Sequence, residues 1–146
     1  MLRIPSITLA LILFSGCSLF GGSDSSELDK ARANWARAGI SDYNYKLTLS
    51  CFCGETGTFD VEVRNGVVVT TTPLAGVQFS GGDERVGKTM DDLFGVLAQA
   101  YAQNADEVLV EYIALLGYPT SISIDYEREV SDDEIFYGVD SFERLN

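Results

Sequence analysis

Two cysteines separated by one residue, Cys51 and Cys53, are the side chains of this chain best suited to covalent chemistry. In an ideal strand they point the same way with Cα atoms ~6.6 Å apart, at the upper limit for a disulfide. Gly54 permits the bend that closure needs, and an oxidising compartment would favour the bond. Catalytic redox use is disfavoured because Glu55 and Asp60 would raise the pKa of a thiol. A structural disulfide, reduced buried thiols, and redox or metal chemistry all stay open on the sequence alone.

A glycine-rich segment, residues 82–89, matches the G-x-x-x-x-G-K-[ST] pattern that binds phosphates in nucleotide hydrolases. That chemistry requires a buried parallel strand before the loop, whereas the surrounding residues alternate as antiparallel strands do. Asp83 and Glu84 would also place two carboxylates against the triphosphate. We therefore predict no nucleotide partner, and interpret Lys88 as a solvated charge and Thr89 as a helix N-cap.

The chain contains no histidine, so the commonest general base and a common zinc ligand are both missing. The carboxylates Asp91 and Asp92 fit a helix N-terminus, and residues 132–134 fit a solvated loop. We predict no catalytic residue, no metal site and no cofactor. Calcium or small-ligand binding is kept as an alternative, although the acidic residues in question lack the regular spacing of a calcium loop: Asp125, Glu127, Asp132, Asp133 and Glu134.

Two amphipathic helices are expected to support these side chains. The first has an apolar stripe that ends at Gly39 and predicts a core position for Trp35: Leu28, Ala31, Trp35 and Ala38. The second begins at Thr89, where Asp92 completes a capping box. Its apolar face is formed by Met90, Leu93, Phe94, Leu97, Ala98 and Tyr101.

Period-two alternation predicts the strands. Apolar and polar residues exchange along residues 43–51, 59–64, 67–72, 108–113, 120–127 and 135–142. Asn65-Gly66 is a strong hairpin signal, and Gly117-Tyr118-Pro119-Thr120 suits a turn between antiparallel strands. The fold class is therefore α+β in the order α-β-β-β-α-β-β-β, a single antiparallel sheet of about six strands with both helices on one face.

The start of the chain has the pattern of a secretion signal. Arg3 precedes an apolar run over residues 4–14, which is too short to cross a bilayer, since a spanning helix takes roughly 20 residues. Leu13-Phe14-Ser15-Gly16-Cys17 resembles the lipobox of bacterial lipoproteins. The resemblance implies that Cys17 is lipidated and that acyl chains such as palmitate hold the protein at a membrane, each buried CH₂ contributing ~0.8 kcal/mol.

The expected organisation has three parts: a signal peptide at 1–16, a lipidated cysteine with a Gly- and Ser-rich tether at 17–27, and one domain at 28–146. Ser18 after the cysteine resembles lipoproteins sorted to the outer membrane, facing the periplasm. Loss of Arg3 would take the formal net charge from −12 to −13. Such a surface repels nucleic acid and anionic lipid headgroups, so no nucleic-acid partner is predicted.

The order and spacing of several motifs resemble a family of bacterial lipoprotein domains of unestablished function. The matching residues are Trp35, Tyr43-x-Tyr45, Cys51-Phe52-Cys53, Asn65-Gly66-Val67, Thr89 with Leu93-Phe94, and Gly117-Tyr118-Pro119-Thr120 with Ile124-Asp125. Tyr112-Ile113 stands where family members read Tyr-Asp, so any role of that aspartate does not transfer. The resemblance implies a fold and an envelope location but no activity.

Three functional hypotheses follow. The first is a non-catalytic binding or scaffolding module, anchored in the cell envelope, whose polar sheet face contacts another envelope protein through residues such as Lys46, Thr48, Asp60 and Glu62. The second is a small-ligand or calcium-binding domain. The third is an enzyme that uses carboxylates or the Cys51 and Cys53 thiols. The sequence favours the first, and predicts that the protein is not an enzyme.

Overall fold

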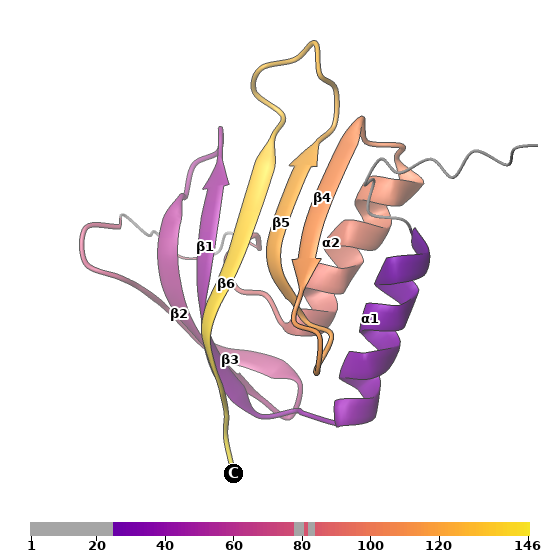
Figure 1. Ribbon diagram of the computed structural model, residues 1–146. Helices are drawn as coiled ribbons and strands as arrows, with labels where there is room; N and C mark the ends of the chain where they lie inside the picture. Colours follow the sequence, from indigo (N-terminus) through magenta and orange to yellow (C-terminus); the bar gives the residue numbers. More distant parts are fainter. Residues whose placement is uncertain (1–24, 78–80, 82–83) are drawn as a thin grey trace, which may run out of the picture.

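A six-stranded antiparallel sheet carries two helices on one of its faces (Figure 1). The computed structural model describes residues 25–77, 81 and 84–146. The elements are α1 Ser25–Ala38, β1 Tyr43–Cys51, β2 Gly57–Arg64, β3 Val67–Pro73, α2 Met90–Ala102, β4 Glu107–Tyr112, β5 Pro119–Asp125 and β6 Ile135–Arg144. The predicted fold class and element order are confirmed. Helix α1 begins inside the range expected to be tether, so residues 25–27 are helical.

The strands lie in the order β3-β2-β1-β6-β5-β4, and all neighbours are antiparallel. Each half of the chain therefore forms a three-stranded meander, and the two meanders join along β1 and β6. This central ladder pairs Tyr43 with Arg144 at one end and Cys51 with Ile135 at the other. The strands that begin and end the sheet-forming part of the chain thus lie side by side at its centre (Figure 1).

Alternation along the strands separates an apolar face from a polar one. On β1, Tyr43, Tyr45, Leu47 and Leu49 are buried, whereas the residues between them are partly exposed. Both helices pack on the buried side: Leu28, Ala31 and Trp35 of α1 and five apolar residues of α2 are buried there. Burial of this apolar area is the main term that holds the fold together.

Trp35 is a core residue, as its position on the apolar stripe predicts. Its side chain is only 4% exposed. The indole meets three rings edge-on, with centroid distances of 5.5 Å to Tyr43, 6.0 Å to Tyr118 and 5.9 Å to Phe142. Edge-to-face contacts at these distances are favourable for aromatic rings. This cluster joins α1, the β4–β5 turn and the central strands.

Two tyrosine hydroxyls of β1 hold the start of α2. The Met90 amide donates to the Tyr43 hydroxyl over 2.9 Å, and the Tyr45 hydroxyl donates to the Lys88 carbonyl. Burial raises the pKa of Tyr43 to about 12 and that of Tyr45 well above its usual value. The predicted capping box is confirmed, since the Thr89 hydroxyl accepts from the Asp92 amide and the Asp92 carboxylate accepts from the Thr89 amide.

The β4–β5 turn packs tightly against α1. Gly117 has φ +83°, and its amide donates to the Ile113 carbonyl over 2.8 Å. A Cβ at this position would overlap the Ala31 carbonyl oxygen and lie 2.9 Å from Cβ of Asn34. Glycine is required here both for the backbone conformation and for the close approach of the helix. The interpretation of this segment as a structural turn fits these contacts.

The polar side of the sheet, called the open face below, carries no helix among the described residues (Figure 1). It is formed by alternate residues of the strands: Asn44, Lys46, Thr48, Ser50, Thr58, Asp60, Glu62, Arg64, Thr70, Thr72, Leu109, Glu111, Ser121, Ser123, Phe136, Gly138, Asp140 and Glu143. Hydroxyls and carboxylates dominate this surface.

Candidate functional site

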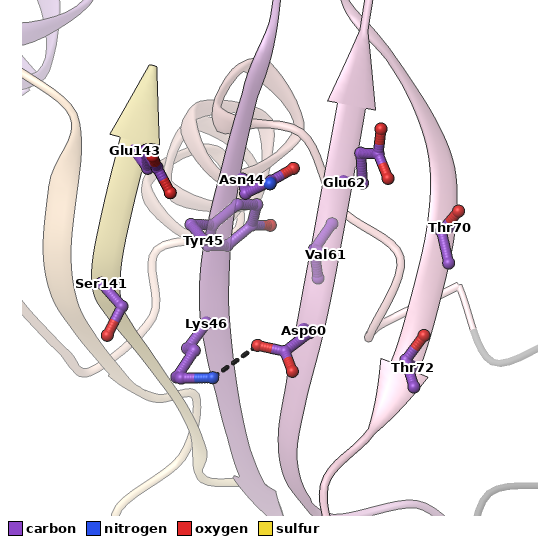
Figure 2. Close-up of a pocket in the computed structure, with 10 residues that line it drawn as sticks. All are labelled: Asn44, Tyr45, Lys46, Asp60, Val61, Glu62, Thr70, Thr72, Ser141 and Glu143. Carbon is purple, nitrogen blue, oxygen red and sulfur yellow. Dashed lines mark hydrogen bonds and ion pairs between the residues drawn. The ribbon is translucent and has the colours of Figure 1, made fainter. Parts of the chain in front are cut away.

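A hollow of about 340 Å³ opens on the open face over β6, β1, β2 and β3 (Figure 2). It is lined by Asn44, Tyr45, Lys46, Asp60, Val61, Glu62, Thr70, Thr72, Ser141 and Glu143. Sequence alternation had pointed to Lys46, Asp60 and Glu62. Alternation along β1 also places Asn44 on the polar side. Thr70, Thr72, Ser141 and Glu143 come from β3 and β6, whose positions beside β2 and β1 only the sheet order reveals.

Strand register arranges the polar side chains in and beside the hollow in two parallel rows, each running across four strands. The first, called the lysine rung, consists of Asp140, Lys46, Asp60 and Thr72. The second, called the asparagine rung, consists of Glu143, Asn44, Glu62 and Thr70. Directly opposite side chains in such a row are close enough to interact.

Two ion pairs lie on this part of the open face. Lys46 Nζ is 2.5 Å from Asp60 Oδ1 across the β1–β2 ladder (Figure 2). Arg64 Nε is 2.7 Å from Glu62 Oε1 along β2. All four side chains are more than a third exposed, so solvent screens these pairs and each contributes about 1 kcal/mol or less to stability.

Asn44 occupies the centre of the asparagine rung, between Glu143 on β6 and Glu62 on β2 (Figure 2). Its amide oxygen is buried and accepts no hydrogen bond within the described part of the chain. Glu143 is exposed and forms no ion pair with any described cation. Within the described residues, the rung thus combines an amide oxygen without a hydrogen-bond donor and a carboxylate without a cationic partner.

A bulge in β6 shapes the edge of the hollow. The register between β1 and β6 shifts between Asn44 and Lys46, and Ser141 there has φ +53°. The extra residue bends the strand and shifts its alternation by one position. Without the bulge, Phe142 would follow Asp140 on the open face; with it, Phe142 packs against the core and Glu143 lies on the open face. Sequence reasoning missed Ser141 and Glu143 because the alternation changes phase at this bulge.

A second part of the open face, over β2, β1, β6 and β5, combines small hydroxyl side chains with one aromatic ring. Phe136 is 37% exposed, and its ring covers Gly138, where an added Cβ would lie 3.3 Å from the ring. The Thr48 and Thr58 hydroxyls lie 3.0 Å apart on the neighbouring strands. Ser121 and Ser123 of β5 pair with Gly138 and Phe136. The aromatic ring supplies an apolar contact within a hydroxyl-rich surface.

Cys51 and Cys53 are joined as a disulfide at the end of β1, with Cα atoms 5.2 Å apart. A bend over residues 52–54 brings the Cα atoms closer than an extended strand would allow. Phe52, between the two cysteines, is 80% exposed. Both cysteines contact the hydrophobic core from its edge.

The segment that matches the phosphate-binding pattern lies in a different context from the one that the motif requires. Strand β3 before it is an antiparallel edge strand. Lys88 Nζ donates to the Glu84 carbonyl over 2.7 Å, and Thr89 caps α2. Gly82 and Asp83 lie outside the described residues.

The acidic segment after β5 was the basis of the calcium alternative. Burial, together with the charges of Asp133 and Glu134, raises the pKa of Asp125. Among the residues that the structure describes, no three carboxylate or cysteine side chains are grouped so that they could hold a metal ion. The segment therefore provides no arrangement of donors for the calcium hypothesis.

The signal peptide over residues 1–16, the lipidation residue Cys17 and most of the expected tether lie outside the described residues. Neither described helix has the length and apolar character needed to cross a membrane.

A model of a family of unknown function matches residues 27–144, which covers nearly all of the described elements. No curated protein and no solved structure matches the chain.

Proposed function

The chain belongs to the family of unknown function DUF6174, and we propose that it is a non-catalytic, lipid-anchored envelope domain that docks a basic protein partner on its open face. The open face is the observation that carries this proposal. The other face of the sheet is filled by helices and aromatic rings, whereas this one presents hydroxyls and carboxylates to solvent.

Charge decides the chemistry of the partner. Around the hollow, Asp60, Glu62, Asp140 and Glu143 outnumber the two cations, Lys46 and Arg64. The whole chain carries a formal charge of −12. Complementary potentials speed the encounter and exclude acidic partners, so the fitting surface is one that carries lysine and arginine. Phe136 would add an apolar contact beside this charged region.

Two features support a non-catalytic role. The absence of histidine removes the commonest general base. The two cysteines are held to each other at the end of β1, away from the hollow.

The lipid anchor is supported by the apolar run over residues 4–14 and by the small residues before Cys17. A tethered domain at the outer membrane would meet its partner in the periplasm.

Site-specific photo-crosslinking in living cells tests the docking surface. A photo-reactive residue at Ser123, on the open face, should yield a defined crosslinked species, whereas one at Arg37, an exposed position on α1, should not. The captured protein, once purified, should bind the domain with an affinity that falls as the NaCl concentration rises from about 0.05 to about 0.5 M. At the higher concentration the screening length is only about 4 Å, so attraction between exposed charges is weakened. Equal crosslinking from both positions, or salt-independent binding, would contradict the proposal.

Metabolic labelling with a palmitate analogue tests the anchor separately. The native protein should take up the label and sediment with membranes, and Cys17→Ser should lose both properties, because acyl chains supply the membrane affinity. A native protein that takes up no label would contradict the proposed lipid anchor. The docking surface would still be tested independently by crosslinking.

A further inference from the structure

The two rungs of the hollow differ in a single respect that bears on binding. In the lysine rung, Lys46 lies between Asp140 and Asp60, so the row supplies its own cation. In the asparagine rung, the equivalent central position between Glu143 and Glu62 holds the neutral Asn44. The two rows have the same chemical pattern, acid–centre–acid–threonine, but only one of them has a positive centre.

Local partners do not replace the missing charge. Arg64 occupies one oxygen of Glu62, and Glu143 has no described cationic partner. The Asn44 amide oxygen is buried without a donor, which is an unfavourable state for a polar atom. A donor that also carries positive charge would pair with both acids, and would satisfy the amide oxygen once the Asn44 side chain turns that atom towards the hollow.

We propose that the asparagine rung binds the ammonium or guanidinium group of one lysine or arginine side chain of the partner. The incoming cation would lie over Asn44, as Lys46 lies at the centre of its own rung, and donate charge-assisted hydrogen bonds to the carboxylates of Glu143 and Glu62. This inference rests on the proposed docking function and specifies the anchoring residue of the partner.

The geometry favours an organic cation over a metal ion. Neighbouring strands are about 4.8 Å apart, so the two acids flank Asn44 from opposite sides rather than converge on one point. Calcium needs six to eight oxygens at about 2.3–2.6 Å, and in the described part of the chain no three carboxylate or cysteine side chains are grouped so that they could hold a metal ion. The hollow of about 340 Å³, with Thr70 and Thr72 at its β3 side, has room for an extended basic side chain (Figure 2).

Peptide titration followed by NMR tests the site without a known partner. The probes are acetyl-Gly-Gly-Arg-Gly-Gly-amide, its lysine counterpart, and a norleucine counterpart that lacks the charge. The basic peptides should shift the Asn44 side-chain amide signals with a dissociation constant on the order of 1–10 mM, as expected for two or three charge-assisted bonds in water. The norleucine peptide should give no shift. Shifts confined to other parts of the protein would overturn the proposal.

The variant Asn44→Lys gives the asparagine rung a cation of its own and should weaken peptide binding at least tenfold. Its matched control is Thr48→Lys, which adds the same charge on the same strand and face, where the directly opposite residues are Gly138 and Thr58 rather than carboxylates. The control should change the affinity less than threefold. Equal weakening by both variants would mean general charge attraction and would overturn the site.

A second variant tests the site independently in case Asn44→Lys does not fold. Glu143 is exposed, so Glu143→Gln should fold normally and weaken binding of the basic peptides about threefold to tenfold. Unchanged affinity in this variant would contradict the role of Glu143. Spermidine tests whether the ligand is instead a free polyamine. If spermidine binds the same residues more than a hundredfold more tightly than the arginine peptide does, the ligand is a free polyamine, and the proposal of a partner side chain is overturned.

The cellular crosslink from Ser123 separates this inference from the docking function. Loss of the crosslink in Asn44→Lys but not in Thr48→Lys supports both. A crosslink that persists in Asn44→Lys overturns the asparagine rung as the anchor while the docking function stands. Peptide binding at Asn44 without any face-specific crosslink overturns the docking function, and leaves the rung as a cation site.

Discussion

The two faces of one sheet use neighbouring residues of the same strand for opposite purposes. Leu47 is fully buried beneath the helices, whereas Thr48, the next residue, lies on the open face with its hydroxyl 3.0 Å from that of Thr58. Tyr43 and Tyr45 fasten α2 to β1, and Asn44 between them faces the hollow. Stability therefore resides on the helix-covered face, and the open face is free to vary in charge and shape without unfolding the domain.

The largest contrast is expected from adjacent substitutions on β1. Leu47→Ala should lower the free energy of unfolding by about 2–5 kcal/mol, because it removes buried methyl groups and leaves a cavity. Thr48→Ala loses one hydroxyl pair and should cost about 1 kcal/mol or less. Urea unfolding of the two variants measures both values. Similar losses would show that the faces do not differ in this way.

A second contrast concerns two glycines near the helices. Gly117→Ala should destabilise by about 2–4 kcal/mol, since it combines a positive φ with an overlap against α1. Gly95 lies in α2, is exposed, and has nothing within 4 Å of an added Cβ. Gly95→Ala should therefore stabilise the domain by up to about 1 kcal/mol. Opposite signs in thermal unfolding would confirm the close packing of the turn.

Tyr43 should make the fold sensitive to alkali. The pKa of Tyr43 is raised to about 12 in the folded protein, above the usual 10.0 of an unfolded tyrosine. Its contribution to stability is therefore complete below pH 10 and is lost as the pH rises towards 12. Tyr43→Phe should cost about 1–3 kcal/mol at neutral pH, because the Met90 amide loses its acceptor, and should flatten the alkaline decline. An unchanged alkaline profile would assign that decline to other groups, such as Tyr45.

The disulfide is expected to contribute less to the free energy of unfolding than the buried groups above. A loop of three residues is short, so closing it restricts the unfolded chain by only about 1.5 kcal/mol. The double variant Cys51→Ser, Cys53→Ser should lower the unfolding free energy by that amount and leave peptide binding to the asparagine rung unchanged. A loss of binding in this double variant would connect the two ends of β1 in a way that the contacts do not predict.

The smallest effect is expected on the open face itself. Lys46→Met breaks an exposed ion pair and should change the unfolding free energy by about 0.5 kcal/mol or less. Because it makes the hollow more acidic, it should strengthen binding of the arginine peptide. NMR titration and urea unfolding of the same sample measure the two responses. A large loss of stability would show that this face also supports the fold.

Sequence patterns were sufficient to place the helices and strands, because each depends on residues close together in the chain. The stripe on α1 located Trp35 in the core, and the Thr89–Asp92 box located the start of α2. Asn65 and Gly66, both with positive φ, form the predicted hairpin between β2 and β3. The start of α1 was placed too late, since Ser25–Glu27 have the composition of a linker yet continue the helix.

The sequence by itself determined which side of each strand is apolar, and hence that one face of the sheet is polar, since period-two alternation is a local property. Only the tertiary structure decided that β6 lies beside β1, which brings Glu143 to Asn44 and Asp140 to Lys46. Strand order depends on long-range pairing, and the bulge at Ser141 changes which residues face outward, so neither can be deduced from spacing along the chain.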